Sequence, residues 1–465
     1  MYIHPYILQY ANSRGIIGFY HKGVRKLADK TPEFYGKRLS RMIQQETISA
    51  KHQTDKKKFY EFHNILRELF PTLFSLCTFE DFDGSFMLIW KGSTDADSVM
   101  FMNHHDVVEA SGDWKYPPFS GEIAEGKVWG RGTLDTKGGL FCMLQAAEEL
   151  ALEGFIPPRD TYFVSACTEE CDSEGAYMIS QELQKRGVRF SLVLDEGGMI
   201  LHDPIGGADG TFAMVGLGEK GWADLKFVAR SAGGHASLPG KNTPLVRLGK
   251  FMAAVEKKKL FKADISPALC KMFEKLASTM GQPLKFILGH PKFFKPLLKK
   301  VMPMVSDAAG AMLGTTLAFT MAGGSEGANV LPQEAWVIGN MRYSHHQGRD
   351  DSIAAVRKLA EKYDIETIVL DAGTPSPLTD HNCAALKLLE KAVSVTFPGV
   401  ITTPYLMNGA SDSRFMSQVS DQCLRFVPFS ITDEQLGSIH GINENVDLKA
   451  LPLAVSFYKY MLQEA

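Results

Sequence analysis

Short apolar runs alternate with amphipathic segments in the first part of the chain. Residues 98–108, 161–167 and 190–195 are apolar and rich in β-branched or aromatic residues, which is typical of buried strands. Between them, residues 138–154 and 173–187 repeat apolar positions at helical spacing. This alternation predicts an α/β fold with a mainly parallel sheet that helices cover on both faces.

A different pattern begins after Gly207, where an alternating strand leads into a glycine-rich turn at 221–239. A helical region follows. The later elements are a strand, a helix and a strand at 335–346, 350–363 and 365–373. This order predicts an inserted α+β domain of the ferredoxin-like type over 215–374. The first domain is then discontinuous and consists of 1–214 and 375–465.

Two segments of the inserted domain are unusually apolar. Residues 308–325 carry no charge, but they are rich in Gly, Ala and Thr, so we expect a buried strand with a flanking turn there and not a membrane span. Residues 284–304 are basic and apolar, which fits a membrane surface. Pro291 and Pro296 interrupt any continuous amphipathic helix, however, so we favour an extra helical insertion near 255–315.

The composition is that of an ordinary globular protein, with 465 residues, 45% hydrophobic and 22% charged. A net charge of −3 without a dominant basic face gives no support for nucleic-acid binding. The seven cysteines are scattered and form neither a disulfide framework nor a C-x-x-C motif, so we expect a reducing compartment, the cytoplasm. The N-terminus lacks the pattern of a secretory signal.

Acidic or histidine side chains follow three predicted strands and precede one predicted helix. They are His104 with Asp106, Asp135, the pair Glu169 and Glu170, and Asp195 with Glu196. Taken alone, the Glu169–Glu170 pair fits a solvated acidic turn, and His104 fits a buried core histidine. In an open α/β sheet, ligands bind at the carboxyl ends of strands. The four clusters together therefore predict one metal site.

His104 and Asp106 are two residues apart on a predicted strand and therefore lie on one face. Asp106 can then hydrogen-bond the imidazole and fix its tautomer, as carboxylates often do for metal-binding histidines. His105 would point to the other face. A two-metal hydrolytic site needs such ligands, a bridging carboxylate and one uncoordinated base.

Ten short motifs occur in the order found in a known enzyme family. They are NHHDVVE (103–109), W-x-x-x-PFSG (114–121), GRGTLDTKGG (130–139), TEE (168–170), LDEGG (194–198), GGHASLP (233–239), NVLP (329–332), NMR (340–342), GASDSR (409–414) and IHGINE (439–444). Together they resemble the zinc aminoacylase, carboxypeptidase and desuccinylase family, metallopeptidase family 20. The long insertion before NVLP is most similar to its carboxypeptidase S branch.

The resemblance implies two divalent metal ions, most often zinc, with cobalt or manganese as alternatives. The implied ligands are His104, Asp135, Glu170, Asp195 and His440. Asp135 would bridge both ions. Asp195 is favoured as the fifth ligand because it follows Glu170 by 25 residues, but relatives place a glutamate there, so Glu196 is the open alternative.

The same resemblance implies that Glu169 is the general base. It would take a proton from the water between the two metals and later give it to the leaving amine. The implied reaction is hydrolysis of an amide bond next to a free carboxylate, as in a carboxypeptidase, a dipeptidase or an N-acyl amino acid hydrolase. Which of these amides is the substrate is left open by the sequence.

The inserted domain would act as a lid and as the surface of a homodimer. The implied substrate contacts are His235, Asn329, Arg342 and Gly409. His235 would stabilise the oxyanion, often from the second subunit, and Arg342 would hold the substrate carboxylate through a bidentate pair. A surface arginine is the simpler alternative for Arg342, and a structural ion pair with Asp412 is equally natural for Arg414.

Three residues depart from the family pattern. Asn103 replaces a common Gly, Glu109 a common Pro, and Thr136 a common Met. None of these changes removes a ligand, so we expect activity to be kept while the walls of the pocket differ.

Two other function classes are weaker. The segment GGSEG around Ser325 fits the nucleophile elbow of serine hydrolases, but that elbow must enter a helix, whereas Pro332 and strand-like residues follow here. A non-catalytic, metal-binding relative is disfavoured because all the expected ligands and the base are present.

Overall fold

The computed structural model describes residues 30–305 and 307–465. Nine strands form a large sheet in the order β1-β2-β6-β3-β7-β17-β9-β16, with β8 paired to β9. Their bounds are β1 (Thr78–Phe82), β2 (Ser85–Trp90), β3 (Ser98–Met102), β6 (Thr161–Ser165), β7 (Phe190–Asp195), β8 (Ile200–His202), β9 (Thr211–Glu219), β16 (Ile401–Met407) and β17 (Cys423–Arg425). The central strands β6, β3, β7 and β17 run parallel, as predicted, and antiparallel pairs flank them.

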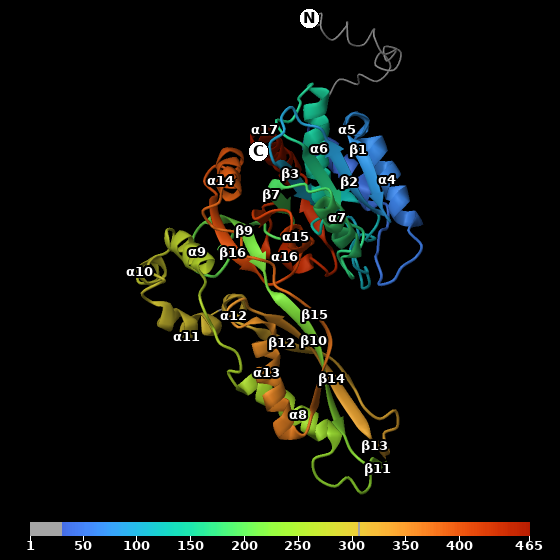
Figure 1. The fold of residues 1–465 in the computed structure, drawn as a ribbon, viewed down its shortest axis with the longest axis vertical. Coiled ribbons are helices and arrows are strands. Elements are labelled where there is room, and N and C mark those ends of the chain that lie inside the picture. Colours follow the sequence, from blue (N-terminus) through green and yellow to red (C-terminus); the bar gives the residue numbers. More distant parts are fainter. Residues whose placement is uncertain (1–29, 306) are drawn as a thin grey trace, which may run out of the picture.

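Helices cover both faces of this sheet (Figure 1). They are α3 (Pro32–Ile43), α4 (Lys57–Leu69), α5 (Pro71–Leu76), α6 (Lys137–Leu152), α7 (Glu174–Lys185), α14 (Ala384–Thr396), α15 (Ser413–Met416), α16 (Asp433–Ser438) and α17 (Ala450–Glu464). Alternate residues of β3 divide between two cores: Phe101 packs with the core of α6 and α17, whereas Met100 and Met102 pack with α7. Because successive side chains of a strand point to opposite faces, the strand contacts helices on both sides of the sheet, as predicted.

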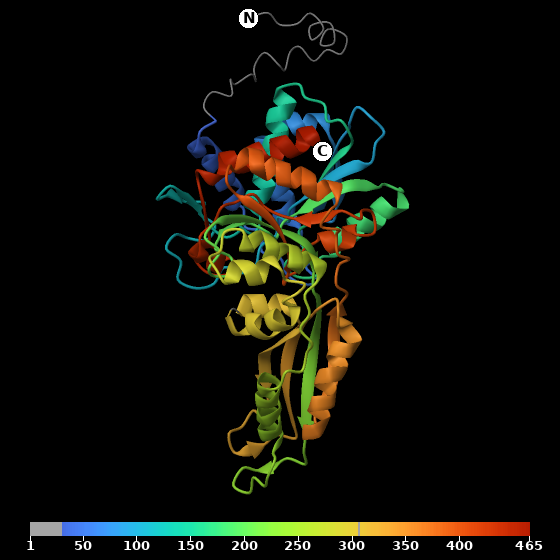
Figure 2. The ribbon, with the colours of Figure 1, turned by 90° about the vertical axis from the view of Figure 1, so that its left-hand side faces the viewer.

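A smaller antiparallel sheet projects from the large one, in the order β12-β14-β10-β15 (Figures 1 and 2). Its elements are β10 (Gly221–Arg230), α8 (Pro244–Lys257), β12 (Thr316–Gly323), β14 (Glu334–Tyr343), α13 (Gly348–Ala360), the 3-10 turn η1 (Glu361–Tyr363) and β15 (Glu366–Gly373). This order and the two helices on one face make a ferredoxin-like unit. β9 still belongs to the large sheet up to Glu219, so the change of sheet lies a few residues beyond the boundary predicted at 215.

A two-stranded ribbon lies at the far tip of the small sheet (Figure 1). It pairs β11 (Gly234–His235) with β13 (Val330–Leu331). The second minor sheet lies beside α3 and consists of β4 (Ile123–Ala124), β5 (Lys127–Trp129) and β18 (Asn445–Asp447), in the order β18-β5-β4.

Four short helices lie between α8 and β12 and form the predicted helical insertion. They are α9 (Pro267–Ala277), α10 (Leu284–Gly289), α11 (Lys295–Val305) and α12 (Asp307–Leu313). Their buried residues pack with Phe212 and Met214 of β9 and Leu406 of β16. None of the helices in the described part of the chain is long and apolar enough to span a bilayer.

The single buried strand expected at 308–325 is wrong. The segment divides into α12 and β12, and most of β12 is exposed or half-buried. β12 is an edge strand that pairs only with β14, so one of its sides has no neighbour in the sheet. The small residues of β12 are therefore compatible with an edge strand as well as with a buried strand.

Candidate metal centre

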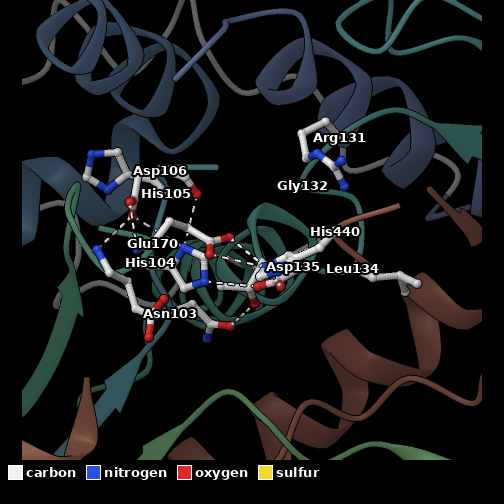
Figure 3. Close-up of polar contacts among 12 residues, drawn as sticks. Asn103, His104, His105, Asp106, Arg131, Gly132, Leu134, Asp135, Glu170 and His440 are labelled. Carbon is white, nitrogen blue, oxygen red and sulfur yellow. Dashed lines mark hydrogen bonds and ion pairs between the residues drawn. The ribbon is translucent and has the colours of Figure 1, made fainter. Parts of the chain in front are cut away.

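The ends of three parallel strands bring the predicted acidic clusters together, and Figure 3 shows His104, Asp135 and Glu170 among them. β3 lies between β6 and β7, so the residues that follow the three strands emerge at one edge of the sheet. His104 and Asp106 follow β3, Glu169 and Glu170 follow β6, and Asp195 ends β7. The fourth cluster, Asp135, lies just before α6 and reaches the same edge.

His440 joins this edge from the end of the chain because β18 pairs with β5. Asn445 lies opposite Trp129, so the loop before β18 is held beside the loop after β5, which carries Asp135. The Gly130 amide also donates to the Glu444 carbonyl at 2.8 Å. The minor sheet therefore places a residue from 439–444 next to one from 130–139.

One carboxylate lies between the two imidazoles. His104 Nε2 is 3.0 Å from Asp135 Oδ1, and His440 Nε2 is 3.0 Å from Asp135 Oδ2. His440 Nε2 is also 3.1 Å from Glu170 Oε2. Each oxygen of Asp135 thus faces a different histidine, which is the arrangement of a carboxylate that bridges two cations.

The pKa values of this cluster reflect its concentrated negative charge. Hydrogen bonds to Asp135 and Glu170 raise the pKa of His440 to about 10. Burial alone would lower the pKa of His104, but its bonds with Asp106 and Asp135 raise it well above the usual value. Burial would raise the pKa of Asp135, yet the two histidines lower it. The carboxylates therefore favour positive charge at this position.

The donor set fits divalent cations. Imidazole and carboxylate are the ligands that zinc takes, and ligand atoms bound to one tetrahedral zinc at about 2.0–2.2 Å lie roughly 3.3 Å apart. The contacts among His104, Asp135, Glu170 and His440 are close to that separation. Ligand atoms of the first three all lie within 4.8 Å of one another.

Asp106 holds several residues of the site in place through hydrogen bonds. The Asp106 carbonyl is 3.0 Å from His104 Nδ1, and its carboxylate is 3.4 Å from the same atom. The carboxylate also accepts hydrogen bonds from the backbone amides of Glu169 and Glu170, at 3.2 and 3.0 Å. Asp106 thus orients the imidazole and the acidic pair together. His105 points to the other face, where it meets Ser165.

Glu444 is the most extensively bonded carboxylate around the site. Its oxygens accept hydrogen bonds from the amides of Gly132, Leu134 and Asp135, at 2.8–3.1 Å. They also form a buried ion pair with Arg131, at 2.8 Å. Sequence reasoning gave Glu444 no role, although it lies four residues after His440 in the quoted motif IHGINE.

Glu169 lies free in a cavity of about 630 Å³ above the cluster. Its carboxylate makes no hydrogen bond or ion pair with the described residues, whereas Glu170 contacts His440. Burial raises the pKa of Glu169 well above its usual range. A half-buried, unpaired carboxylate beside candidate ligands can accept a proton from water.

Asp195 and Glu196 differ in the direction of their side chains. Asp195 is buried, and its carboxylate accepts a hydrogen bond of 2.7 Å from the Ser413 amide. Glu196 lines the cavity together with Asp135 and Glu170. Burial and the charge of Asp135 raise the pKa of Glu196 well above its usual value. The geometry therefore favours Glu196, the alternative, over Asp195 as a ligand.

Two of the predicted substrate contacts lie in the cavity. Gly409 lines it from the large-sheet side and Arg342 from β14. Arg342 Nε donates to Asn340 Oδ1 at 3.1 Å, and the guanidinium has no carboxylate partner among the described residues. Its other donors are free for an anion.

Arg414 also lines the cavity, and the predicted ion pair with Asp412 is wrong. Arg414 donates to the Ser411 carbonyl at 3.2 Å and to the Ser173 hydroxyl at 2.8 Å. Arg414 lies in the short helix α15, and a carbonyl just before this helix and a serine just before α7 accept its hydrogen bonds.

The other two predicted contacts lie far from the cavity. His235 is on β11, and the Asn329 carbonyl accepts from the Ala236 amide at 2.9 Å, so both belong to the tip of the small sheet (Figure 1). Both side chains are exposed, and neither lines the cavity. Within one chain, they do not meet the metal centre.

Two departures from the family pattern contact each other. The Thr136 hydroxyl donates to Asn103 Oδ1 at 2.8 Å. Asn103 directly precedes the candidate ligand His104, and Thr136 directly follows the candidate ligand Asp135. A Cβ at Gly139 would lie 2.1 Å from the same Asn103 oxygen, so this glycine lets the strand and α6 approach closely. The unusual asparagine is therefore accommodated by its two neighbours.

The serine hydrolase alternative lacks the required geometry. Ser325 lies between β12 and β13, so a strand and not a helix follows it. Its hydroxyl donates to the Val330 carbonyl at 2.8 Å.

Known proteins are similar to this chain over most of its length. A model of the peptidase family M20/M25/M40 matches residues 100–464. The human N-fatty-acyl-amino acid synthase/hydrolase PM20D1 is 30% identical over 438 residues, which is 92% of this chain and 87% of that protein. Carboxypeptidase S of Saccharomyces cerevisiae is 27% identical over 457 residues, with 87% of this chain and 78% of that protein covered.

Solved structures share the fold. The M20 family metallo-carboxypeptidase Sso-CP2 of Sulfolobus solfataricus superposes with a TM-score of 0.68 at 17% identity, covering 92% of this chain and 98% of that one. The dipeptidase Dug1p of Saccharomyces cerevisiae gives a TM-score of 0.66 at 16% identity, covering 93% and 95%. Both the large sheet and the inserted unit are therefore part of a known architecture.

Proposed function

This chain belongs to the peptidase family M20/M25/M40, and we propose that it is a two-metal hydrolase that cleaves an amide bond next to a free carboxylate. It is a hydrolase by family, since its named relatives are hydrolases. The observation that carries the proposal is Asp135, which faces His104 with one oxygen and His440 with the other, beside the unpaired Glu169.

Five side chains would hold the metals. One group would be His440 and Glu170 with Asp135, and the other would be His104 and Glu196 with the same Asp135. Zinc suits this mixture of imidazole and carboxylate, and cobalt or manganese would also be accepted. When bound, two such cations supply polarisation of the scissile carbonyl and acidification of water.

Glu169 would move the proton. Its carboxylate is not engaged by other side chains, so it is free to take a proton from water and to return it to the departing amine. Desolvation in the cavity raises its pKa, which makes it a stronger base than an exposed glutamate. Asp106 would keep it in place through the Glu169 amide.

Arg342 would bind the carboxylate of the substrate. Burial lowers the pKa of its guanidinium, although arginine stays charged, and the guanidinium forms no ion pair with a carboxylate among the described residues. Arg414 lines the same cavity and adds positive charge, while Gly409 leaves room for the chain of the substrate. A carboxylate in bidentate contact with Arg342 would fix the amide over the metal centre.

His235 and Asn329 would act on a second copy of the chain. Their place at the tip of the small sheet supports this, because within one chain they are remote from the cavity. The small-sheet unit would then serve for dimerisation and as a lid, with His235 donating to the oxyanion of the facing site. We retain the cytoplasm as the compartment, which the seven free thiols favour.

The substrate would be a dipeptide, a peptide with a free carboxyl end or an N-acyl amino acid. A test combines metal content with a panel of such substrates, each offered as the free acid and as its carboxamide. We expect about two divalent ions per chain, hydrolysis of at least one free acid, and rejection of the matching carboxamide. Purified protein that binds no metal, or that hydrolyses acids and carboxamides equally, would contradict the proposal.

A further inference from the structure

Helices α10 and α11 and the turn between them expose large apolar side chains. The exposed residues are Leu284, Phe286, Phe293, Leu297, Val301 and Met304, which we call the outer face. Phe293 is 80% exposed and Met304 is 79% exposed. A cluster of large apolar side chains in water marks an interaction site more often than isolated exposed residues do.

The outer face is continuous along α11. Leu297, Val301 and Met304 are spaced by four and three residues, so they lie on one side of α11, and Phe293 lies in the turn just before this helix. Phe293 and Phe286 both contact Phe294, with ring centroids 5.0 and 5.6 Å apart, which links α10 to this stripe.

A second apolar side of α11 is already used. Leu298 and Met302 are buried against the helical insertion and the large sheet. The outer residues Leu297, Val301 and Met304 are not part of this buried core.

Positive charge surrounds the outer face. Residues 284–304 contain five lysines and no acidic residue, although the whole chain has a net charge of −3. Lys295 and Lys299 form ion pairs with Asp264. Lys285, Lys292 and Lys300 are exposed and have no ion pair with the described residues.

We propose that the outer face docks on an anionic phospholipid surface. Exposed Phe, Leu and Met side chains would enter the boundary between headgroups and acyl chains, and Lys285, Lys292 and Lys300 would meet the lipid phosphates and carboxylates. α10 and α11 project from one flank of the molecule, where a flat surface can reach them (Figures 1 and 2). A second copy is a poorer occupant, since a two-fold contact would bring these lysines against each other.

Co-sedimentation with vesicles tests this proposal. We expect the full chain to bind vesicles of phosphatidylcholine with phosphatidylserine, to bind phosphatidylcholine alone more weakly, and to be released by salt. The double variant Phe293→Ser with Met304→Ser, and the double variant Lys292→Glu with Lys300→Glu, should each bind at least about tenfold more weakly.

A matched control separates this face from general surface hydrophobicity. Ile156 and Val395 are exposed apolar residues outside the insertion, so Ile156→Ser with Val395→Ser should bind vesicles like the unchanged protein. Circular dichroism and thermal unfolding show that each variant is folded.

Three results would overturn the proposal. The first is no binding of the unchanged chain to anionic vesicles, which would leave an acidic protein partner as the occupant. The second is equal binding by the outer-face and control variants. The third is a dimer in solution that the outer-face variants dissociate, because a second copy would then cover this face.

Discussion

The metal centre and the tip of the small sheet carry predicted site residues in very different surroundings. Asp135, Glu170 and His104 are fixed by hydrogen bonds from several segments of the chain. The side chain of His235 is exposed and, among the described residues, bonds only to Ser237 of its own turn, at 2.8 Å. The first set is ordered by one chain alone, whereas in our proposal the second acts only when another copy of the chain faces it.

The contrast shows which site residues are positioned by the fold of a single chain and which are not. Polar groups at the sheet edge are positioned by strands, the minor sheet and Glu444, so their geometry is set during folding. The tip of the small sheet, by contrast, holds His235 in an exposed turn with few contacts. Three substitutions test this division, in order of decreasing expected effect.

Replacing the proposed base should have the largest effect. Glu169→Gln removes the group that accepts the proton but keeps its size, so we expect kcat to fall by about 10²–10⁴-fold. Metal content, measured by atomic spectroscopy, should be unchanged because Glu169 is not among the close contacts of the cluster. The exposed Glu174→Gln is the matched control. A loss of less than tenfold would assign the base to another group.

Replacing the tip histidine tests whether two chains share a site. His235→Ala should lower kcat by about 10²–10³-fold through loss of one oxyanion donor, while the exposed His202→Ala should not. Co-expression with Glu169→Gln should recover activity, because one site of a mixed dimer then has both an intact base and an intact histidine from its neighbour.

An absence of recovery in that mixture, with both variants folded, would place His235 outside the reaction or within its own chain's site. The measurement is the steady-state rate of the co-purified pair. The rate of each variant measured alone is the reference, so that a mixture of two inactive homodimers is not mistaken for a mixed dimer.

Replacing the carboxylate behind the ligands should have a smaller effect. Glu444→Gln puts an amide against the donors of Gly132, Leu134 and Asp135, so we expect metal affinity and kcat/KM to fall by about 10–100-fold. Added zinc should restore part of the activity. The exposed Glu434→Gln should behave like the unchanged chain, and unchanged metal affinity in Glu444→Gln would argue against a positioning role.

The large sheet was predictable because its signals are local. Apolar runs and helical spacing lie within single segments, and the rule on strand ends joined His104, Glu170 and Asp135 without any knowledge of distances. Helix capping is a local signal as well, since Thr31 accepts from the Phe34 amide as the N-cap of α3, directly in front of Pro32.

The remaining features depend on contacts that sequence does not encode locally. Asp195 and Glu196 are neighbours at a strand end, where adjacent side chains point to opposite sides, so a difference of one residue decides which enters the cavity. Arg414 has several possible hydrogen-bond acceptors nearby in the sequence, and only the folded chain shows that it donates to Ser411 and Ser173.

A single residue, Lys220, separates the last residue of β9 from the first residue of β10 (Figure 1). Its buried ammonium donates to the carbonyls of Ala311 and Gly314, and a Cβ at Gly221 would lie 2.2 Å from the Tyr343 ring. From this pivot, β10 extends for 10 residues, or roughly 33 Å. Twisting the backbone here by about 10° would therefore swing the distal ribbon through roughly 6 Å, so a small torsion has a long lever arm.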